Sequence, residues 1–351
     1  MQKITFKARC TLNFRELKRI LIINTLNLFS KSKDFYTSKL TNFMSQHKLI
    51  DEINTKYKDL GENPDTYLAG FRYTNPVNYW DYCEVDTLLA LQKPKTFLPD
   101  ENVFIMYHQV NELLFKMILS EIDQVANTEN IELDLFVNKL GRINRYFDVL
   151  ISSFAIMKYG MDVAQYMKFR DALTPASGFQ SVQYRKIEMA CTDLNNLIDA
   201  RYKHKAEEFV GLQAKIDKLY WRAAGLNHKT GKKSLMLSMF EQKYGKELLD
   251  TATQYEHKNL RAVYNSLNDT DKKSPKLIKA LKALDNKINI KWTMTHYRTA
   301  EHYLESSGKA VAATGGSPWK KYMHPKYQKR IFFPELWSEE EVNTWGHEHE
   351  E

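Results

Sequence analysis

Glycine and proline are both scarce in this chain, with 13 glycines and nine prolines among 351 residues. A sandwich or barrel of short strands needs many tight turns, and such turns are built largely from these two residues. Sustained alternation of apolar and polar residues, the pattern of a half-buried strand, is missing as well. The sequence therefore disfavours an all-β fold, although its 43% of apolar residues is enough for a large buried core.

Cysteine is rarer still: Cys10, Cys83 and Cys191 are the only three, and they lie far apart. An odd number at such distances predicts no disulfide framework and indicates a reducing compartment. No apolar run reaches the ~18–20 residues that a membrane-spanning helix requires. We therefore expect a cytoplasmic protein that has no membrane partner.

The formal net charge of +8 suggests a nucleic-acid partner, but the excess is confined to one end of the chain. Residues 1–43 contain nine lysines and arginines and two acids, which leaves 42 basic and 41 acidic residues elsewhere. The body is nearly neutral and has no basic stripe, so we expect no nucleic-acid binding. We expect residues 1–43 to be a disordered targeting presequence or, as we favour, an artefact that precedes a true start at Met44.

Apolar residues recur at helical spacing through most of the body. Helices are expected over residues 79–92, 101–125, 135–157, 181–198 and 275–306. Asp162 is placed to cap a further short helix that runs through Arg170. We predict an all-α fold, a single multi-helix bundle over residues 44–351, in which about 200–270 form a small accessory helical pair.

Two pairs of residues four apart share a helical face and could carry chemistry. Phe104 and His108 place an imidazole beside an aromatic wall, where a neutral histidine can accept or relay a proton. The alternative is a core histidine with one satisfied hydrogen bond. Tyr166 and Arg170 precede a loop, and the planar guanidinium of Arg170 could grip a carboxylate with two parallel hydrogen bonds. The alternative is an arginine that faces solvent or pairs with an acid.

Motifs for a metal held by several side chains are absent, since the chain has no His-Glu-x-x-His and no Cys-x-x-Cys. His296 and His302 are six residues apart, about 600° around a straight helix at ~100° per residue, so one ion cannot bind both. A haem needs only one axial protein ligand, which a single histidine permits but does not require. Cys-x-x-Cys-His is also absent, so a haem would be held non-covalently.

Four blocks of the sequence resemble the tryptophan 2,3-dioxygenase family, and the resemblance runs from about Tyr79 to Trp337. In chain order the blocks are residues 104–109 with 112–116, 169–170 with 175–181, Trp292 with His296, and 314–317. Chance similarity does not account for four separate blocks in the family's order.

The resemblance implies an all-α protein that encloses a b-type haem and cleaves the indole C2–C3 bond of L-tryptophan. Both atoms of O₂ would enter the product, N-formyl-L-kynurenine. His296 would be the axial ligand of the haem iron, and His108 would be the catalytic residue that binds the indole NH. Arg170 would bind the substrate carboxylate, with Tyr166 beside it, and Thr314 would contact the amino-acid head group.

The resemblance also implies a homotetramer in which the N-terminal helix of a neighbouring subunit closes the substrate pocket. The expected residues of that helix are Tyr79, Tyr82 and Cys83. The expected residues of the indole pocket are Phe104, Ile105, Met106 and Tyr107, together with His108.

Three departures from the family pattern bear on these expectations. The segment between His296 and Thr314 is longer than expected, which makes His302 a rival for the iron. Cys83 replaces a larger aliphatic residue, and Asn111 and Leu114 replace larger aromatic ones, which could alter the preferred indole.

Two other functions remain open at this point. One is a haem-dependent aromatic amino-acid hydroxylase on the same scaffold, and the other is a haem-binding sensor without enzymatic activity.

Overall fold

The computed structural model describes residues 45–173, 180–227, 230–305 and 324–347. Helices dominate these residues, and no strand occurs among them. Within the described ranges, β pairing is found as two isolated bridges, Ile198 with Leu219 and Leu226 with Lys233. The predicted all-α class is confirmed. Within the same ranges, no helix has both the length and the apolar character needed to cross a membrane. The basic extension and Thr314 lie outside the described residues.

The chain divides into two compact units, residues 1–88 and 89–351. The first unit contains a helix over residues 45–59, then α2 (Pro64–Phe71) and α3 (Tyr79–Tyr82), and α4 (Val85–Leu89) begins within it. The expectation of one domain from residue 44 onwards stays a prediction.

The single helix predicted over residues 79–92 is wrong, because the chain forms two short helices there. Glu84 has a φ of 50°, in the left-handed region, and separates α3 from α4. Such a backbone is uncommon for a residue other than glycine, and the apolar spacing of the segment carries no sign of it.

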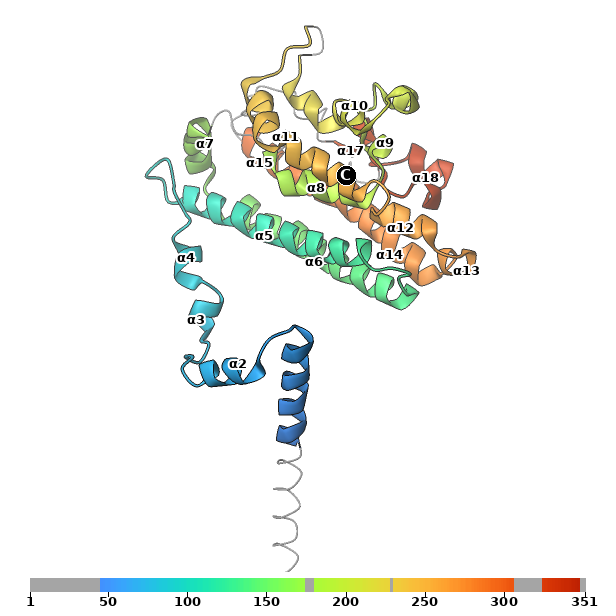
Figure 1. The fold of residues 1–351 in the computed structure, drawn as a ribbon. Helices are drawn as coiled ribbons and strands as arrows, with labels where there is room; N and C mark the ends of the chain where they lie inside the picture. The colour runs from blue at the N-terminus through green and yellow to red at the C-terminus, as the bar shows by residue number, and fades with distance from the viewer. Residues whose placement is uncertain (1–44, 174–179, 228–229, 306–323, 348–351) are drawn as a thin grey trace, which may run out of the picture. The chain divides into compact units, whose positions relative to one another are not determined.

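The second unit holds the helices that surround the candidate site. In chain order they are α5 (Asp100–Ala126), α6 (Leu133–Tyr159), α7 (Val163–Ala172), α8 (Val182–Cys191), α9 (Leu194–Leu197), η2 (Lys203–Glu208), α10 (Leu212–Ile216), η3 (Tyr220–Gly225), α11 (Leu235–Tyr255), α12 (Leu260–Ser266), α13 (Asp269–Lys272), α14 (Pro275–Asn286), η4 (Lys287–Trp292), α15 (Thr293–Glu305), α17 (Pro325–Gln328), η5 (Pro334–Leu336) and α18 (Glu339–Asn343). α5 packs on α6 and α8, α14 packs on α6, and α11 packs on α8 (Figure 1).

The helices of this unit form where an apolar stripe meets good caps. The stripe of α6 is buried at alternating steps of three and four residues: Phe136, Leu140, Ile143, Phe147, Leu150, Phe154 and Met157. As expected, Asp162 caps α7 by accepting from the backbone NH of Gln165. The Ser181 hydroxyl caps α8 in the same way, although that helix ends at Cys191 rather than near residue 198.

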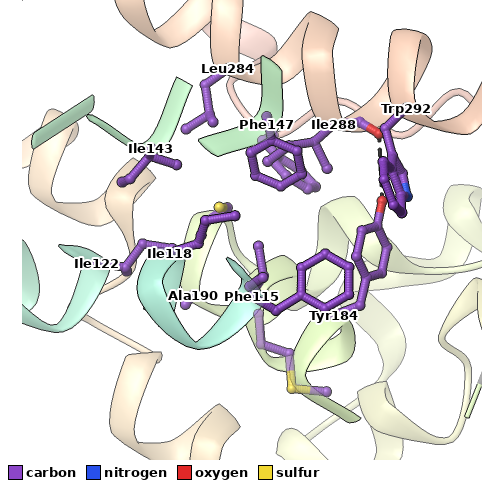
Figure 2. Packing of buried hydrophobic residues seen from close by; sticks show 14 of the residues in the cluster. Phe115, Ile118, Ile122, Ile143, Phe147, Tyr184, Ala190, Leu284, Ile288 and Trp292 are labelled. Carbon is purple, nitrogen blue, oxygen red and sulfur yellow. Dashed lines mark hydrogen bonds between the residues drawn. The ribbon is translucent and has the colours of Figure 1, made fainter. Parts of the chain in front are cut away.

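One hydrophobic core joins these helices. Phe115 and Ile118 of α5 meet Phe147 of α6, and Ile288 and Trp292 of η4 lie beside them (Figure 2). α11 contributes Leu237, Phe240 and Leu248 to the same core. The helix at the centre of the segment expected to be accessory thus packs directly on the main body of the unit.

Candidate functional site

The face of α5 that carries Phe104 and His108 is built as the spacing predicts. The two rings lie 4.2 Å apart between centroids, and Tyr107 packs edge-on against the imidazole at 5.4 Å. His108 Nδ1 lies 2.7 Å from the carbonyl oxygen of Phe104. Because that oxygen can only accept, Nδ1 carries the proton, and Nε2 of the neutral ring is left as an acceptor.

His108 is exposed to solvent, and yet desolvation by the surrounding protein lowers its pKa. The imidazole thus keeps accessible surface while protein atoms crowd it on other sides. At neutral pH its imidazole is therefore uncharged.

His296 lies on α15, four residues beyond the end of η4, and has the same combination of properties. It is exposed, while desolvation and, secondly, the charge of His108 lower its pKa to about 4. Each imidazole thus lies within electrostatic range of the other. The ring of His296 stacks on Phe154 with centroids 5.8 Å apart, and Phe154 contacts Trp292 at 4.8 Å. A neutral imidazole in such surroundings is suited to bind a metal.

Aromatic rings from three helices gather beside Phe104. The Phe169 ring of α7 lies 5.6 Å from Phe104, and the Tyr166 ring lies 6.2 Å from it and 5.5 Å from Phe169. Tyr303 of α15 packs on Tyr166 at 4.3 Å, and its hydroxyl donates to the carbonyl of Met157 on α6. These rings, tilted or edge-on to one another, form an apolar wall that continues from His108.

Arg170 brings a positive charge to this wall. Its side chain is buried, and its guanidinium interacts with the hydroxyl of Tyr166, one turn earlier on α7. Burial raises the pKa of Tyr166, and the charge of Arg170 opposes that rise. Arg170 also forms an ion pair with the exposed Asp171 over 3.7 Å. A planar guanidinium can bind a carboxylate through two parallel hydrogen bonds.

The remaining predicted residues fall into three groups. Ile105 and Met106 share α5 with His108, and Met106 is exposed. Tyr79, Tyr82 and Cys83 lie in the first unit and are all exposed. Thr314 lies outside the described residues.

His302, the rival iron ligand, occupies a different setting from His296. It is exposed, and its ring meets the edge of Tyr303 at 5.0 Å. Of these two histidines, it is His296 whose pKa is lowered by the charge of His108. Among the described residues, no group of three or more histidine, cysteine, aspartate or glutamate side chains could hold a metal ion.

Several residues of this site escape the sequence analysis. Phe154 and Tyr303 are ordinary core positions by their helical spacing, and Phe169 was seen only as a neighbour of Arg170. Their approach to the two histidines depends on how α6, α7 and α15 pack, which no local pattern encodes. The chemical inventory of the site is therefore two neutral imidazoles, a wall of aromatic rings and a buried cation.

Comparison with known proteins gives consistent matches. A family model described as tryptophan 2,3-dioxygenase matches residues 70–263. That range includes Phe104, His108 and Arg170 and ends before His296.

Curated relatives with the same description come from several bacteria. The relative from Bradyrhizobium sp. strain BTAi1 is 28% identical over 280 residues, which cover 78% of this chain and 96% of the relative. The relative from Pseudomonas aeruginosa strain UCBPP-PA14 is 27% identical over 274 residues, or 77% of this chain and 91% of the relative. The relative from Ruegeria sp. strain TM1040 is 34% identical over 160 residues, which cover 45% of this chain and 57% of the relative.

Proposed function

The chain belongs to the tryptophan 2,3-dioxygenase family, and from that premise we propose how it opens the indole ring of L-tryptophan. The reaction cleaves the C2–C3 bond, and both atoms of O₂ enter the product, N-formyl-L-kynurenine. This is the first step of tryptophan breakdown through kynurenine. The observation that carries the proposal is the pair of neutral histidines, His108 and His296, each of which packs against aromatic rings.

The side chains beside the two histidines suit a b-type haem. Such a cofactor would be held by a neutral histidine in apolar surroundings, and polar groups near it would tune its reaction. His296, with Phe154 and Trp292 beside it, would hold the iron, and His108 would supply a polar group. When bound, the haem supplies the activation of O₂; the remaining tasks fall to the side chains of the chain.

His108 is proposed to orient the indole. Its Nδ1 proton is engaged by the Phe104 carbonyl, so Nε2 can accept the hydrogen bond of the indole NH. The lowered pKa of His108 keeps this acceptor available at neutral pH. Phe104, Tyr166 and Phe169 would stack around the ring and exclude water.

Arg170 is proposed to bind the carboxylate of the amino acid through two parallel hydrogen bonds. A substrate that lacks the carboxylate would lose these two hydrogen bonds. Arg170 would therefore select an amino acid rather than a free indole. Ile105, Met106 and Tyr107 are proposed to complete the indole pocket, and Thr314 to contact the head group.

The active form is proposed to be a homotetramer. In the first unit Tyr73 is 83% exposed, Tyr79 75% and Tyr82 80%, which is a large aromatic surface for a monomer to leave in water. Tyr79, Tyr82 and Cys83 are proposed to close the pocket of a neighbouring subunit.

A second surface supports assembly. On α5, Met106, Val110, Leu113 and Met117 are all exposed and follow one another at steps of four, three and four residues. This spacing produces a continuous apolar seam, which another helix can cover. We name these four residues the α5 seam.

The product of the reaction tests the proposal. The haem-loaded protein, reduced without oxygen and then given ¹⁸O₂ and L-tryptophan, should yield N-formyl-L-kynurenine with two labelled oxygens. Incorporation of one oxygen would indicate the hydroxylase instead, and haem binding without turnover would indicate the sensor. Either result would overturn the proposal.

The iron ligand is tested with a matched pair of variants. His296→Ala should lose the ability to retain haem during gel filtration, whereas His302→Ala should keep it, as measured by the Soret absorbance of the eluted protein. The opposite pattern would assign the iron to His302.

A further inference from the structure

The helical run that carries His296 contains an irregular turn. α14, η4 and α15 follow one another without a break from residue 275 to residue 305, and η4 (Lys287–Trp292) is a π-helix. A π turn accommodates one extra residue, and one residue corresponds to ~100° of rotation. The direction of every side chain on α15, including His296, therefore depends on whether η4 keeps its π geometry.

Side chains satisfy a backbone group inside this turn. The carbonyl oxygen of Ile288 lies 3.2 Å from the Thr293 hydroxyl, five residues further along the helix. The Tyr184 hydroxyl of α8 lies 3.5 Å from the same oxygen, and Figure 2 shows its approach to η4. The five-residue spacing of the Thr293 contact matches the hydrogen-bond spacing of a π turn, so both side chains bind a carbonyl that belongs to this geometry.

Arg330 contacts Thr293 as well. Its guanidinium donates to the Thr293 hydroxyl oxygen over 3.0 Å and pairs with Glu188 of α8 over 2.7 Å. The side chains of all three residues are buried. Glu188 also pairs with Arg185 over 3.2 Å. A buried ion pair contributes little net stability because both charges lose their water, so a role in fixing one geometry explains its presence better.

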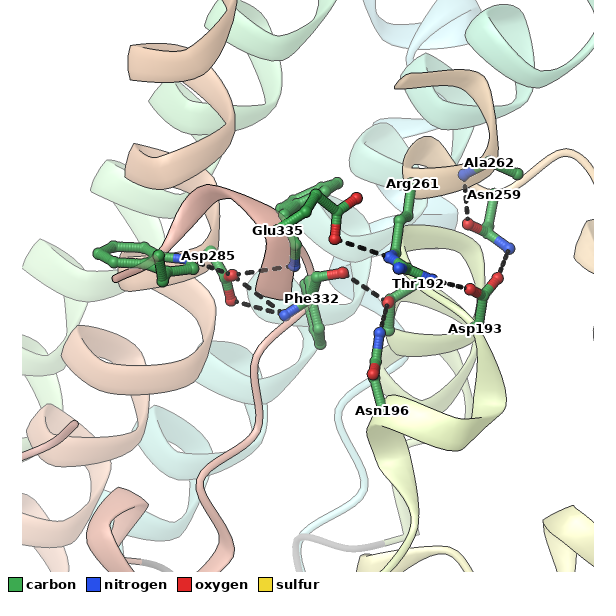
Figure 3. A network of polar contacts seen from close by, with 11 residues as sticks. Thr192, Asp193, Asn196, Asn259, Arg261, Ala262, Asp285, Phe332 and Glu335 are labelled. Carbon is green, nitrogen blue, oxygen red and sulfur yellow. Dashed lines mark hydrogen bonds and ion pairs between the residues drawn. The ribbon is translucent and has the colours of Figure 1, made fainter. Parts of the chain in front are cut away.

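The chain around Arg330 is itself anchored from two sides. The NH of Phe332 donates to Asp285 of α14 over 3.0 Å, and its carbonyl accepts from the Thr192 hydroxyl over 2.6 Å (Figure 3). The segment that carries Arg330 is thus tied to α14, which precedes the turn in the same helical run, and to Thr192 at the C-terminal end of α8. Arg330 therefore links Thr293, which follows the turn, to residues that precede it or lie outside the run.

We propose that Thr293 and Arg330 are positioning residues that hold η4 in its π geometry and so aim His296 at the haem iron. This inference rests on the proposed function, because it takes His296 as the iron ligand. Neither residue is assigned a contact with substrate or haem.

The same helix supplies a matched control. The Thr299 hydroxyl is also buried and donates to the carbonyl of Thr295 over 2.8 Å. That bond stays within one regular turn. A general effect of losing a threonine hydroxyl should therefore be equal at positions 293 and 299, whereas a positioning effect should be confined to position 293.

The experiment compares Thr293→Val, Thr293→Ser and Thr299→Val with the unchanged protein. Each apo-protein is titrated with haemin at the Soret band, and the iron–histidine stretching band of the reduced, loaded protein is recorded by resonance Raman spectroscopy. We expect Thr293→Val to bind haemin at least about tenfold more weakly and to shift the band, with unchanged far-ultraviolet circular dichroism. Thr293→Ser should restore both values, and Thr299→Val should change neither.

Equal behaviour of Thr293→Val and Thr299→Val would overturn the inference. Should Thr293→Val lose helix content, Arg330→Lys takes its place, because lysine keeps the charge but not the fork that reaches Glu188 and Thr293 together. An unshifted band in Arg330→Lys would also overturn it. Failure of the proposed function is seen separately, as normal haemin binding by His296→Ala.

Discussion

His108 and His296 are two of ten histidines in the sequence, and their surroundings decide their protonation. Burial among aromatic rings lowers both pKa values, that of His296 to about 4. A protonated imidazole can neither bind iron nor accept the indole NH. The aromatic wall therefore keeps these two residues in their useful form, in addition to the contact with the substrate that we propose for it.

The pH dependence of the reaction follows from His108. Its pKa lies below the ordinary 6.5, so the acceptor is lost only as the pH falls through that lowered value. We expect kcat/KM of the haem-loaded protein to be level above pH 6.5 and to fall at lower pH. His108→Asn keeps an acceptor that does not titrate, and it should remove this fall, whereas His302→Ala should retain it. A fall with a midpoint at or above pH 6.5 would contradict the assignment.

Arg170→Ala is expected to weaken the use of L-tryptophan by roughly 2–5 kcal/mol in kcat/KM, mainly through KM, because the substrate carboxylate would be buried without a partner. Steady-state kinetics measures the effect. Tryptamine lacks the carboxylate and should lose little, and Arg145→Ala, on an exposed position of α6, should behave like the unchanged protein. An equal loss for both substrates would mean that Arg170 acts on something other than the carboxylate.

Helical spacing predicts a residue's neighbours only along its own helix. The pairs Phe104 with His108 and Tyr166 with Arg170 were accessible from sequence because residues four apart share a face. The convergence of Phe154 and Tyr303 on the site was not, since it depends on the packing of separate helices.

At the scale of elements, the long helices of the second unit were predictable from their apolar stripes, although α5 and α6 have no side-chain cap. Asp162 caps α7 as the sequence indicates, and α8 follows Ser181, where a helix was expected to start. The apolar spacing of the sequence does not reveal where a helix is interrupted. The left-handed Glu84 and the π turn η4 leave the surrounding apolar spacing readable as helix, and both depend on backbone geometry rather than composition.

Asp285 joins two elements that are distant in sequence, and its loss should be severe. Its carboxylate accepts from the backbone NH groups of Phe332 and Phe333, from the indole of Trp337 and from Asn289. Asp285→Ala leaves these buried donors unpaired, so we expect the free energy of unfolding to fall by roughly 3–5 kcal/mol.

Urea unfolding of the apo-protein measures this loss. Asp250→Ala removes an exposed carboxylate that pairs with Lys246 one turn away, and it should change stability by less than about 1 kcal/mol. Similar losses for the two variants would show that Asp285 is not the anchor of the C-terminal segment.

At the scale of the whole molecule, the sequence indicated helix class and overall chemistry but not the division at residue 88. Surfaces for assembly are equally hard to predict. The α5 seam has the spacing of an ordinary buried stripe, and only the structure shows that its four residues are exposed in a single chain.

The α5 seam gives a test of assembly. Leu113→Glu places a charge in the middle of the seam and should reduce the assembled mass seen by light scattering after gel filtration, because burying an unpaired carboxylate is costly. Leu235→Glu makes the same change at an exposed leucine of α11 and should leave the mass unchanged. A tetramer that tolerates Leu113→Glu would place the interface elsewhere.

The location of Arg330 near the C terminus sets an order of events during synthesis. The ribosome extends the chain from its N terminus at roughly 5–20 residues per second, and His296 emerges before Arg330 and the anchored Phe332. A nascent chain in which these residues are still inside the ribosome lacks the Arg330 contact with its π turn. Under the proposed function, full capture of the cofactor then waits until Arg330 has emerged, and haemin added to a cell-free synthesis after chain release should load the protein as fully as haemin present from the start.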